Sequence, residues 1–282
     1  MSIHIGVNQP QKHSPGLPLQ YSESTAWGMA VVAEQAGYDS LRVLRGKEAT
    51  RQAVNNALAD AAGTLRAGDT LFVSFAGHST LVRDVAFGPT ADWERDGFDE
   101  MWCLFDDVLA DDELADYWRL FEPGVRILVV SESSFSGGMG RIQEKSLTPY
   151  GSTSGEAQPP QPIVFRGAVG RTGDAGAGTE SCVEPPKAAN GIHASLLLLA
   201  ACREDQHARD GVFARHLFEV WNNGAFRGSY CDLYRQVRNR VVAEVSGQEP
   251  RIQLLGAADA EFALAPAFHV EWRRSYARSV YR

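Results

Sequence analysis

Residues 127–139 read ILVVSESSFSGGM, and this stretch decides how the rest of the chain is interpreted. The first half is apolar and β-branched, which is typical of a buried strand. The second half is small and hydroxyl-rich and ends in Gly137 and Gly138, which favours a tight turn. A strand that runs into such a loop presents side chains at the edge of a sheet, where α/β proteins place their chemistry. The loop offers Ser133, Ser134 and Ser136, and no cysteine.

The same alternation of strand and helix patterns extends in both directions. Helical spacing is found between the apolar runs. Short apolar runs predict strands at residues 3–8, 39–44, 69–77, 125–131, 193–201 and 251–256, and helices are expected at residues 24–37, 49–66, 111–121, 211–221 and 230–245. Alternating strands and helices, with strands that are apolar throughout, indicate an α/β fold. We expect a mostly parallel central sheet with helices on both faces.

The bulk composition narrows the function classes. The chain has 282 residues, 44% of them hydrophobic, which is enough for one large α/β domain. A formal net charge of -8 argues against nucleic acid or an anionic membrane as a partner. The chain starts directly on a strand pattern, and no apolar run is long enough to span a bilayer. The four cysteines, Cys103, Cys182, Cys202 and Cys231, form no CxxC pair, so we expect no thiolate metal site and a reducing, cytoplasmic environment.

Two predicted strands end in residues that suit acyl-transfer chemistry. His78 follows Gly77 at the end of one strand, where an imidazole suits general acid–base work. Ser134 follows the next strand, and adjacent parallel strands would bring the two side chains within reach as a nucleophile and its base. Backbone N–H groups of nearby glycines would face a developing oxyanion. The plainer alternatives are a surface or capping histidine and a Ser/Gly-rich turn.

An acidic segment between these two strands is the third feature. Asp99, Asp106, Asp111 and Asp112 lie before or at a predicted helix start. Clustered carboxylates suit a hard cation such as calcium, although the spacing is not that of an EF-hand. The alternative is a solvated acidic loop whose last aspartates favour the helix N-terminus.

In this order, the motifs resemble the caspase-like clan, and in particular the bacterial metacaspases, also called orthocaspases. That family carries its catalytic histidine in Ser-Gly-His-Gly, and here AGHS places His78 at the same position. It carries its catalytic cysteine in Asp-Ser-Cys-His-Ser-Gly, and here ESSFSG places Ser134 on the cysteine and Glu132 on the acid. The stretch LLLLAACREDQ resembles the start of the smaller caspase segment, with Asp205 at an acidic position. The similarity extends from about residue 5 to about Gly256.

The resemblance implies a caspase-like fold in a single domain over residues 1–282. Residues 1–135 would be the large-subunit-like part, residues 136–191 a loop- and linker-rich segment, and residues 192–282 the small-subunit-like part. It also implies an endopeptidase that cleaves peptide or protein substrates after Arg or Lys, and calcium as the one cofactor to expect. The residues that it assigns are catalytic His78 and Ser134, oxyanion-binding Gly77, substrate-binding Glu132, Asp205, Ala76 and Glu23, and calcium-binding Asp99, Asp111 and Asp112.

Departures from the family pattern concern the chemistry itself. Ser134 replaces the nucleophilic cysteine, and a hydroxyl is far less acidic than a thiol. It needs a strong base oriented by a third group, and no residue can be assigned to that orienting role. Arg141 stands near the position of a fourth calcium ligand, which has no match. We therefore expect a catalytically inactive chain.

Two explanations stay open for this serine, and one further alternative stays open for the function of the chain. The serine is either a substitution introduced to trap an intact precursor, or the natural residue of a pseudoprotease that binds a basic peptide or partner without cleaving it. A doubly wound α/β binding domain unrelated to proteolysis is the third possibility.

Overall fold

The computed structural model describes residues 1–13, 16–83, 98–134, 182–183, 191–257 and 259–270. The strands are β1 Ser2–Gly6, β2 Leu41–Arg45, β3 Thr70–Ala76, β4 Ser79–Arg83, β5 Phe98–Cys103, β6 Val108–Ala110, β7 Arg126–Glu132, β8 Ser195–Ala200 and β9 Arg251–Gly256. The helices are α1 Ser22–Gln35, α2 Arg51–Thr64, α3 Asp111–Arg119, α4 Val212–Trp221, α5 Tyr230–Glu244 and α6 Ala260–Leu264, with 3₁₀ turns η1 Gly46–Glu48 and η2 Asn222–Gly224. None of the helices in these ranges is both long and apolar enough to cross a bilayer.

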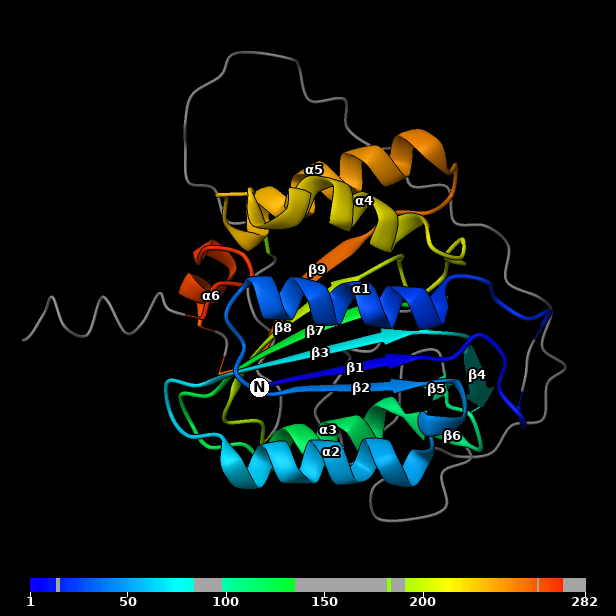
Figure 1. Ribbon diagram of the computed structural model, residues 1–282, viewed down its shortest axis with the longest axis horizontal. Helices are drawn as coiled ribbons and strands as arrows, with labels where there is room; N and C mark the ends of the chain where they lie inside the picture. Colours follow the sequence, from blue (N-terminus) through cyan, green and yellow to red (C-terminus); the bar gives the residue numbers. More distant parts are fainter. Residues whose placement is uncertain (14–15, 84–97, 135–181, 184–190, 258, 271–282) are drawn as a thin grey trace, which may run out of the picture.

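Six strands form the central sheet in the order β2-β1-β3-β7-β8-β9. All neighbours are parallel except β8 and β9, which run antiparallel. The parallel strands β2, β1, β3, β7 and β8 therefore share one carboxyl edge, which Figure 1 shows at the arrowheads of β1, β3 and β7. The predicted mostly parallel α/β architecture is confirmed.

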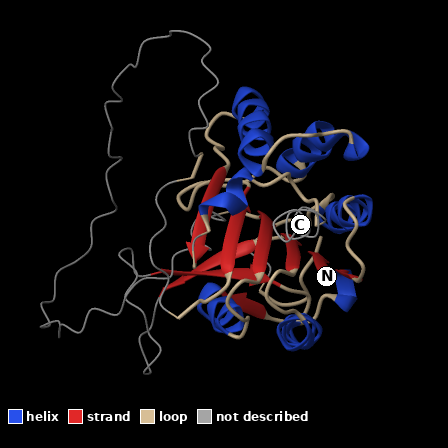
Figure 2. Cartoon of the chain, turned by 90° about the vertical axis from the view of Figure 1, so that its left-hand side faces the viewer, coloured by secondary structure: helices blue, strands red, loops and turns tan. Residues whose placement is uncertain are grey.

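Helices cover both faces of this sheet, as Figures 1 and 2 show. Alternate residues of each strand enter different cores because a strand repeats every two residues. In β7, Ile127 and Val129 join the core under α2 and α3, whereas Leu128 and Val130 join the core under α1, α4 and α5. The near-continuous apolar run of the sequence follows from this double burial.

A second sheet of three antiparallel strands, β4-β5-β6, lies beyond the end of β3. The sequence analysis did not predict it. Its strands are short, and polar residues interrupt them, as in residues 98–103, which read FDEMWC, so they lack the long apolar run that identifies a buried strand.

Two of the four cysteines form a disulfide, Cys182–Cys231, with 5.4 Å between the Cα atoms. The cysteine spacing, which contains no CxxC pair, gave no sign of this disulfide. Cys231 lies in the first turn of α5, so the bond joins the described residues 182–183 to that helix. Cys103 and Cys202 are free and buried.

Candidate active site

The ends of β3 and β7 bring the two predicted catalytic positions to the same edge. Ala76 pairs with Glu132 in the last step of the parallel register, and Gly77 N–H donates to the Glu132 carbonyl oxygen at 3.2 Å. His78 and Ser134 follow directly. The hydroxyl of Ser79 donates to the carbonyl oxygen of Ser134, which ties the two loops together. The backbone positions are therefore adjacent, as the strand-end argument predicts.

The side chain of His78, however, has a different partner. Its Nε2 lies 2.9 Å from the carbonyl oxygen of Leu17, in the loop between β1 and α1. Across the residues that the structure describes, no hydrogen bond joins His78 to Ser134. The predicted nucleophile–base contact between these two side chains is thus not formed.

Ser134 instead contacts the loop that follows β8. Its Oγ accepts a hydrogen bond from the Ala208 N–H at 3.3 Å and lies 3.4 Å from Nδ1 of His207. The sequence analysis missed His207. A signal was present, because β8 is the other parallel neighbour of β7 and His207 lies seven residues beyond Ala200, where β8 ends.

The Gly77 N–H is engaged within the sheet, which argues against its predicted oxyanion role. Ala76 pairs with Gly6 of β1 on one side and with Glu132 of β7 on the other. Its side chain is buried and does not face an open pocket. Glu23 lies in the first turn of α1, where its backbone N–H donates to the side chain of Asn8.

Glu132 is a buried carboxylate at the very end of β7, only 5% exposed. Oε1 accepts the backbone N–H of Ala214 in the first turn of α4, and Oε2 accepts the Thr25 hydroxyl. Burial raises the pKa of Glu132 to about 7, and the nearby charge of Asp210 adds to the rise, while the hydrogen bonds oppose it. The carboxyl group two residues before the nucleophile position is therefore harder to ionise than an ordinary glutamate.

A cavity of about 590 Å³ opens beside this carboxylate. Thr25, the hydrogen-bond partner of Glu132, lines it from α1, and Asp210 and Gly211 line it from the loop before α4. Asp210 accepts the backbone N–H groups of Gln20 and Tyr21 and so fixes the start of α1 against this loop. The size lies within the range of pockets that bind small ligands or single side chains.

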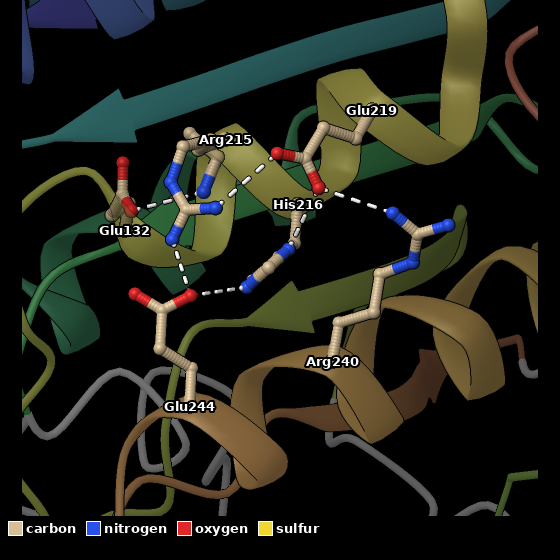
Figure 3. Close-up of polar contacts among 7 residues, drawn as sticks. Glu132, Arg215, His216, Glu219, Arg240 and Glu244 are labelled. Carbon is tan, nitrogen blue, oxygen red and sulfur yellow. Dashed lines mark hydrogen bonds and ion pairs between the residues drawn. The ribbon is translucent and has the colours of Figure 1, made fainter.

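Arg215 and Glu219 of α4 and Glu244 of α5 also line the cavity. Figure 3 shows the polar contacts that these side chains make with each other and with His216 and Arg240. Arg215 bonds both Glu219 and Glu244, and His216 lies 3.0 Å from Glu219 and 2.9 Å from Glu244. Arg240 reaches Glu219 at 3.1 Å. Glu219 and Glu244 thus already have cationic partners within the protein. The bonds just described give no cationic partner to Asp210 or Glu132.

Asp205, the second predicted pocket acid, is exposed and lies 3.4 Å from Nε of Arg203 in the same loop. It does not line the cavity beside Glu132. The structure thus separates the two predicted acids: Glu132 is buried next to a pocket, and Asp205 is at the surface.

The predicted calcium ligands are only partly described. Asp111 and Asp112 open α3, and the Asp112 N–H donates to Asp111 Oδ1 at 2.9 Å. Met101 of β5 pairs with Ala110 of β6 in antiparallel register. Asp99 lies two residues before Met101, and Asp112 lies two residues after Ala110. Carboxylates suit calcium, but the described residues contain no group of three His, Cys, Asp or Glu that could hold a metal ion. Calcium binding stays a prediction.

Comparison with known proteins assigns the class. The model of the caspase domain family (peptidase C14) matches residues 5–255. Metacaspase-4 of Arabidopsis thaliana is 32% identical over 110 residues, which cover 39% of this chain and 25% of the plant protein. The crystal structure of protein GSU0716 from Geobacter sulfurreducens superimposes with a TM-score of 0.68 at 25% identity, covering 96% of this chain and 98% of that one. The structure of pro-sf-caspase-1 gives a TM-score of 0.46 at 14% identity, covering 92% and 91% of the two chains.

The chain belongs to the caspase domain family, because the match extends over most of its length. This match and the mostly parallel six-stranded sheet confirm the predicted caspase-like clan and fold class. The aligned stretch spans only a quarter of the plant metacaspase.

Proposed function

We propose that this caspase-like protease receives polypeptides with Arg or Lys before the cleaved bond, and that Ser134 makes cleavage slow. The observation that carries the specificity is Glu132, a buried carboxylate two residues before Ser134 whose hydrogen-bond partner Thr25 lines the 590 Å³ cavity. A buried carboxylate attracts a cation more strongly than an exposed one, and an arginine or lysine side chain would offer charge-assisted hydrogen bonds. Asp210 adds negative charge at the same wall.

The specificity is tested by measuring peptide binding in the absence of cleavage. Fluorescent tetrapeptides ending in Arg, Lys, Leu or Asp are titrated into the Ser134→Ala protein and followed by fluorescence anisotropy. We expect Arg and Lys peptides to bind at least about tenfold tighter than the others, as one charge-assisted hydrogen bond would give. Because Glu132 must be ionised, their affinity should rise on the order of tenfold from pH 6 to pH 8.

Two substitutions added to this protein locate the acid. Glu132→Gln keeps the size of the side chain and removes the charge, so the preference for Arg and Lys should disappear. Asp205→Asn is the matched control, because Asp205 is exposed and paired with Arg203, and the preference should persist. A preference that survives Glu132→Gln would refute the assignment of Glu132.

A second candidate function is a pseudoprotease that binds basic peptides without cutting them. The contact of His78 with the Leu17 carbonyl, in place of Ser134, favours it. The Ser134→Cys variant separates the two candidates. Fluorogenic Arg and Lys peptides are assayed with and without calcium, and cleavage in either condition supports the protease. Peptide binding with no cleavage in both conditions supports the binding protein.

A further inference from the structure

His207 is a second histidine at the nucleophile position, and it comes from a different strand end than His78. Its Nδ1 lies 3.4 Å from Ser134 Oγ, and His207 is exposed, in the loop after β8. Serine catalysis requires a general base within hydrogen-bond distance of the attacking hydroxyl. Such contacts are often long before substrate binds and tighten in the reacting complex.

The hydrogen bonds around Ser134 Oγ set the direction of its proton. The Ala208 N–H donates to Oγ, so it occupies an acceptor position of the hydroxyl and leaves the O–H proton to be donated elsewhere. His207 Nδ1 is the acceptor within reach when that imidazole carries its proton on Nε2. The Ser79 hydroxyl, which bonds the carbonyl oxygen of Ser134, fixes the backbone from the opposite side.

From this geometry we infer that His207, rather than His78, is the general base for Ser134, and that any bond cleavage by this chain proceeds by serine-type acyl transfer. The inference rests on the proposed function, since it names the base for that reaction. The family pattern assigns the base to His78, whose Nε2 is engaged by the Leu17 carbonyl oxygen here. His207 answers the need for a strong base that a hydroxyl nucleophile creates and a thiol does not.

The reaction balances with water as the only co-reactant. Ser134 Oγ attacks the carbonyl carbon of the substrate, the C–O bond forms, and the hydroxyl proton moves to His207 Nδ1. The C–N bond then breaks as His207 returns that proton to the leaving amine. Water, deprotonated by the same nitrogen, attacks the acyl-serine, and its proton returns to Ser134 when the carboxylic acid product leaves.

A fluorophosphonate probe tests the base separately from substrate specificity, because it carries no basic side chain. Ser134 Oγ displaces fluoride from phosphorus, and mass spectrometry of the digested protein gives the rate of labelling at residue 134. We expect His207→Gln to lower this rate at least about 100-fold, the usual contribution of a general base. His193→Gln is the matched control, since His193 is exposed and precedes β8 at the opposite edge of the sheet.

Chemical rescue distinguishes a base from a merely structural residue. In His207→Ala, added imidazole should restore labelling in a dose-dependent manner, because the exposed position leaves room for it. Labelling of His207→Gln at the rate of the unsubstituted protein, a larger loss in His78→Gln than in His207→Gln, or no labelling above that of Ser134→Ala would overturn the inference. None of these outcomes depends on Glu132, so a failure of the Arg and Lys specificity would be seen separately.

Discussion

At the scale of single residues, Glu132 combines the proposed recognition role with a structural one. Its carboxylate accepts the Ala214 N–H at the start of α4 and the Thr25 hydroxyl of α1. A helix N-terminus favours a negative charge, yet burial penalises it more, and the pKa rises to about 7. Glu132, at the carboxyl edge of the sheet, therefore ionises only when a nearby cation or a higher pH stabilises its negative charge.

This balance predicts a pH-dependent difference between the protein and its Glu132→Gln variant. The pKa of Glu132 is raised above its ordinary value of 4.5, so its favourable contribution is complete below pH 4.5 and is lost as pH rises through about 7. Relative to Glu132→Gln, the protein should lose on the order of 3 kcal/mol of unfolding free energy between those limits. Urea unfolding at a series of pH values measures the difference.

The buried His4 also makes the stability of the protein depend on pH, but it does not affect this comparison. It is buried, contacts the Ser74 hydroxyl, and has its pKa lowered to about 3 by burial, so its own effect destabilises the protein as pH falls below 6.5. Both proteins contain His4, so that effect cancels in the difference. A difference that stays flat from pH 4.5 to 7.5 would contradict the burial of Glu132 as an acid of raised pKa.

Residue-level assignments from sequence succeeded where strand order alone determined them. Both His78 and Ser134 follow strand ends, and parallel strands share one edge, so their backbones meet. The direction of a side chain depends on loops that no periodicity describes. For that reason the sequence could not tell that His78 contacts Leu17 or that His207 contacts Ser134.

At the scale of elements, α4 is positioned by Glu132 at its N-terminus and by the polar contacts of His216 on the side that faces α5. Glu132 accepts its N-terminal N–H group, and the carboxylates of Glu219 and Glu244 flank His216 on the side facing α5. The hydrogen bond from His216 holds the pKa of Glu219 below its usual range, and that from Arg215 does the same for Glu244.

Removing that bridge should loosen α4 against α5. His216 is nearly buried, so His216→Gln loses two charge-assisted hydrogen bonds in a place that water fills poorly. We expect the midpoint of thermal unfolding, measured by circular dichroism, to fall by roughly 3–6 °C. Arg240→Gln is the matched control, because Arg240 bonds the same Glu219 from an exposed position and should cost less than about 2 °C. Equal effects of the two substitutions would show that the bridge contributes no more than a surface ion pair.

The elements found from sequence share one property, which is burial on a regular face. The strands β1, β3, β7 and β8 carry apolar runs, and α2 has a spaced apolar stripe with Thr50 as its N-cap. The three strands of the second sheet have no such run and were missed. Their pairing depends on a register between separated segments, which a single sequence pattern does not encode.

At the scale of the whole molecule, the central sheet joins residues 1–135 to residues 192–282, the two parts that were predicted to be large-subunit-like and small-subunit-like. The parallel pairing of β7 with β8 crosses between residues 1–135 and residues 192–282. Both cores also draw residues from the two parts. The disulfide Cys182–Cys231 lies wholly within the later part of the chain, so it does not tie one part to the other. Among the described residues, the two parts are therefore held together by the hydrogen bonds between β7 and β8 and by burial of apolar side chains.

A cut between the two parts should leave them together. A site-specific protease sequence inserted between Ser154 and Gly155 breaks the chain in a segment outside the described residues, and leaves β7, β8 and both cores intact. Interfaces of this kind bury side chains as a domain core does, which predicts a stable complex rather than a transient one. The cleaved protein should elute as one species of unchanged size in native gel filtration and as two fragments in denaturant. Separation under native conditions would mean that chain continuity, and not the shared sheet, holds the molecule together. The same cleaved sample, labelled with the fluorophosphonate probe, would then show whether Ser134 and His207, which come from the two different parts, still meet.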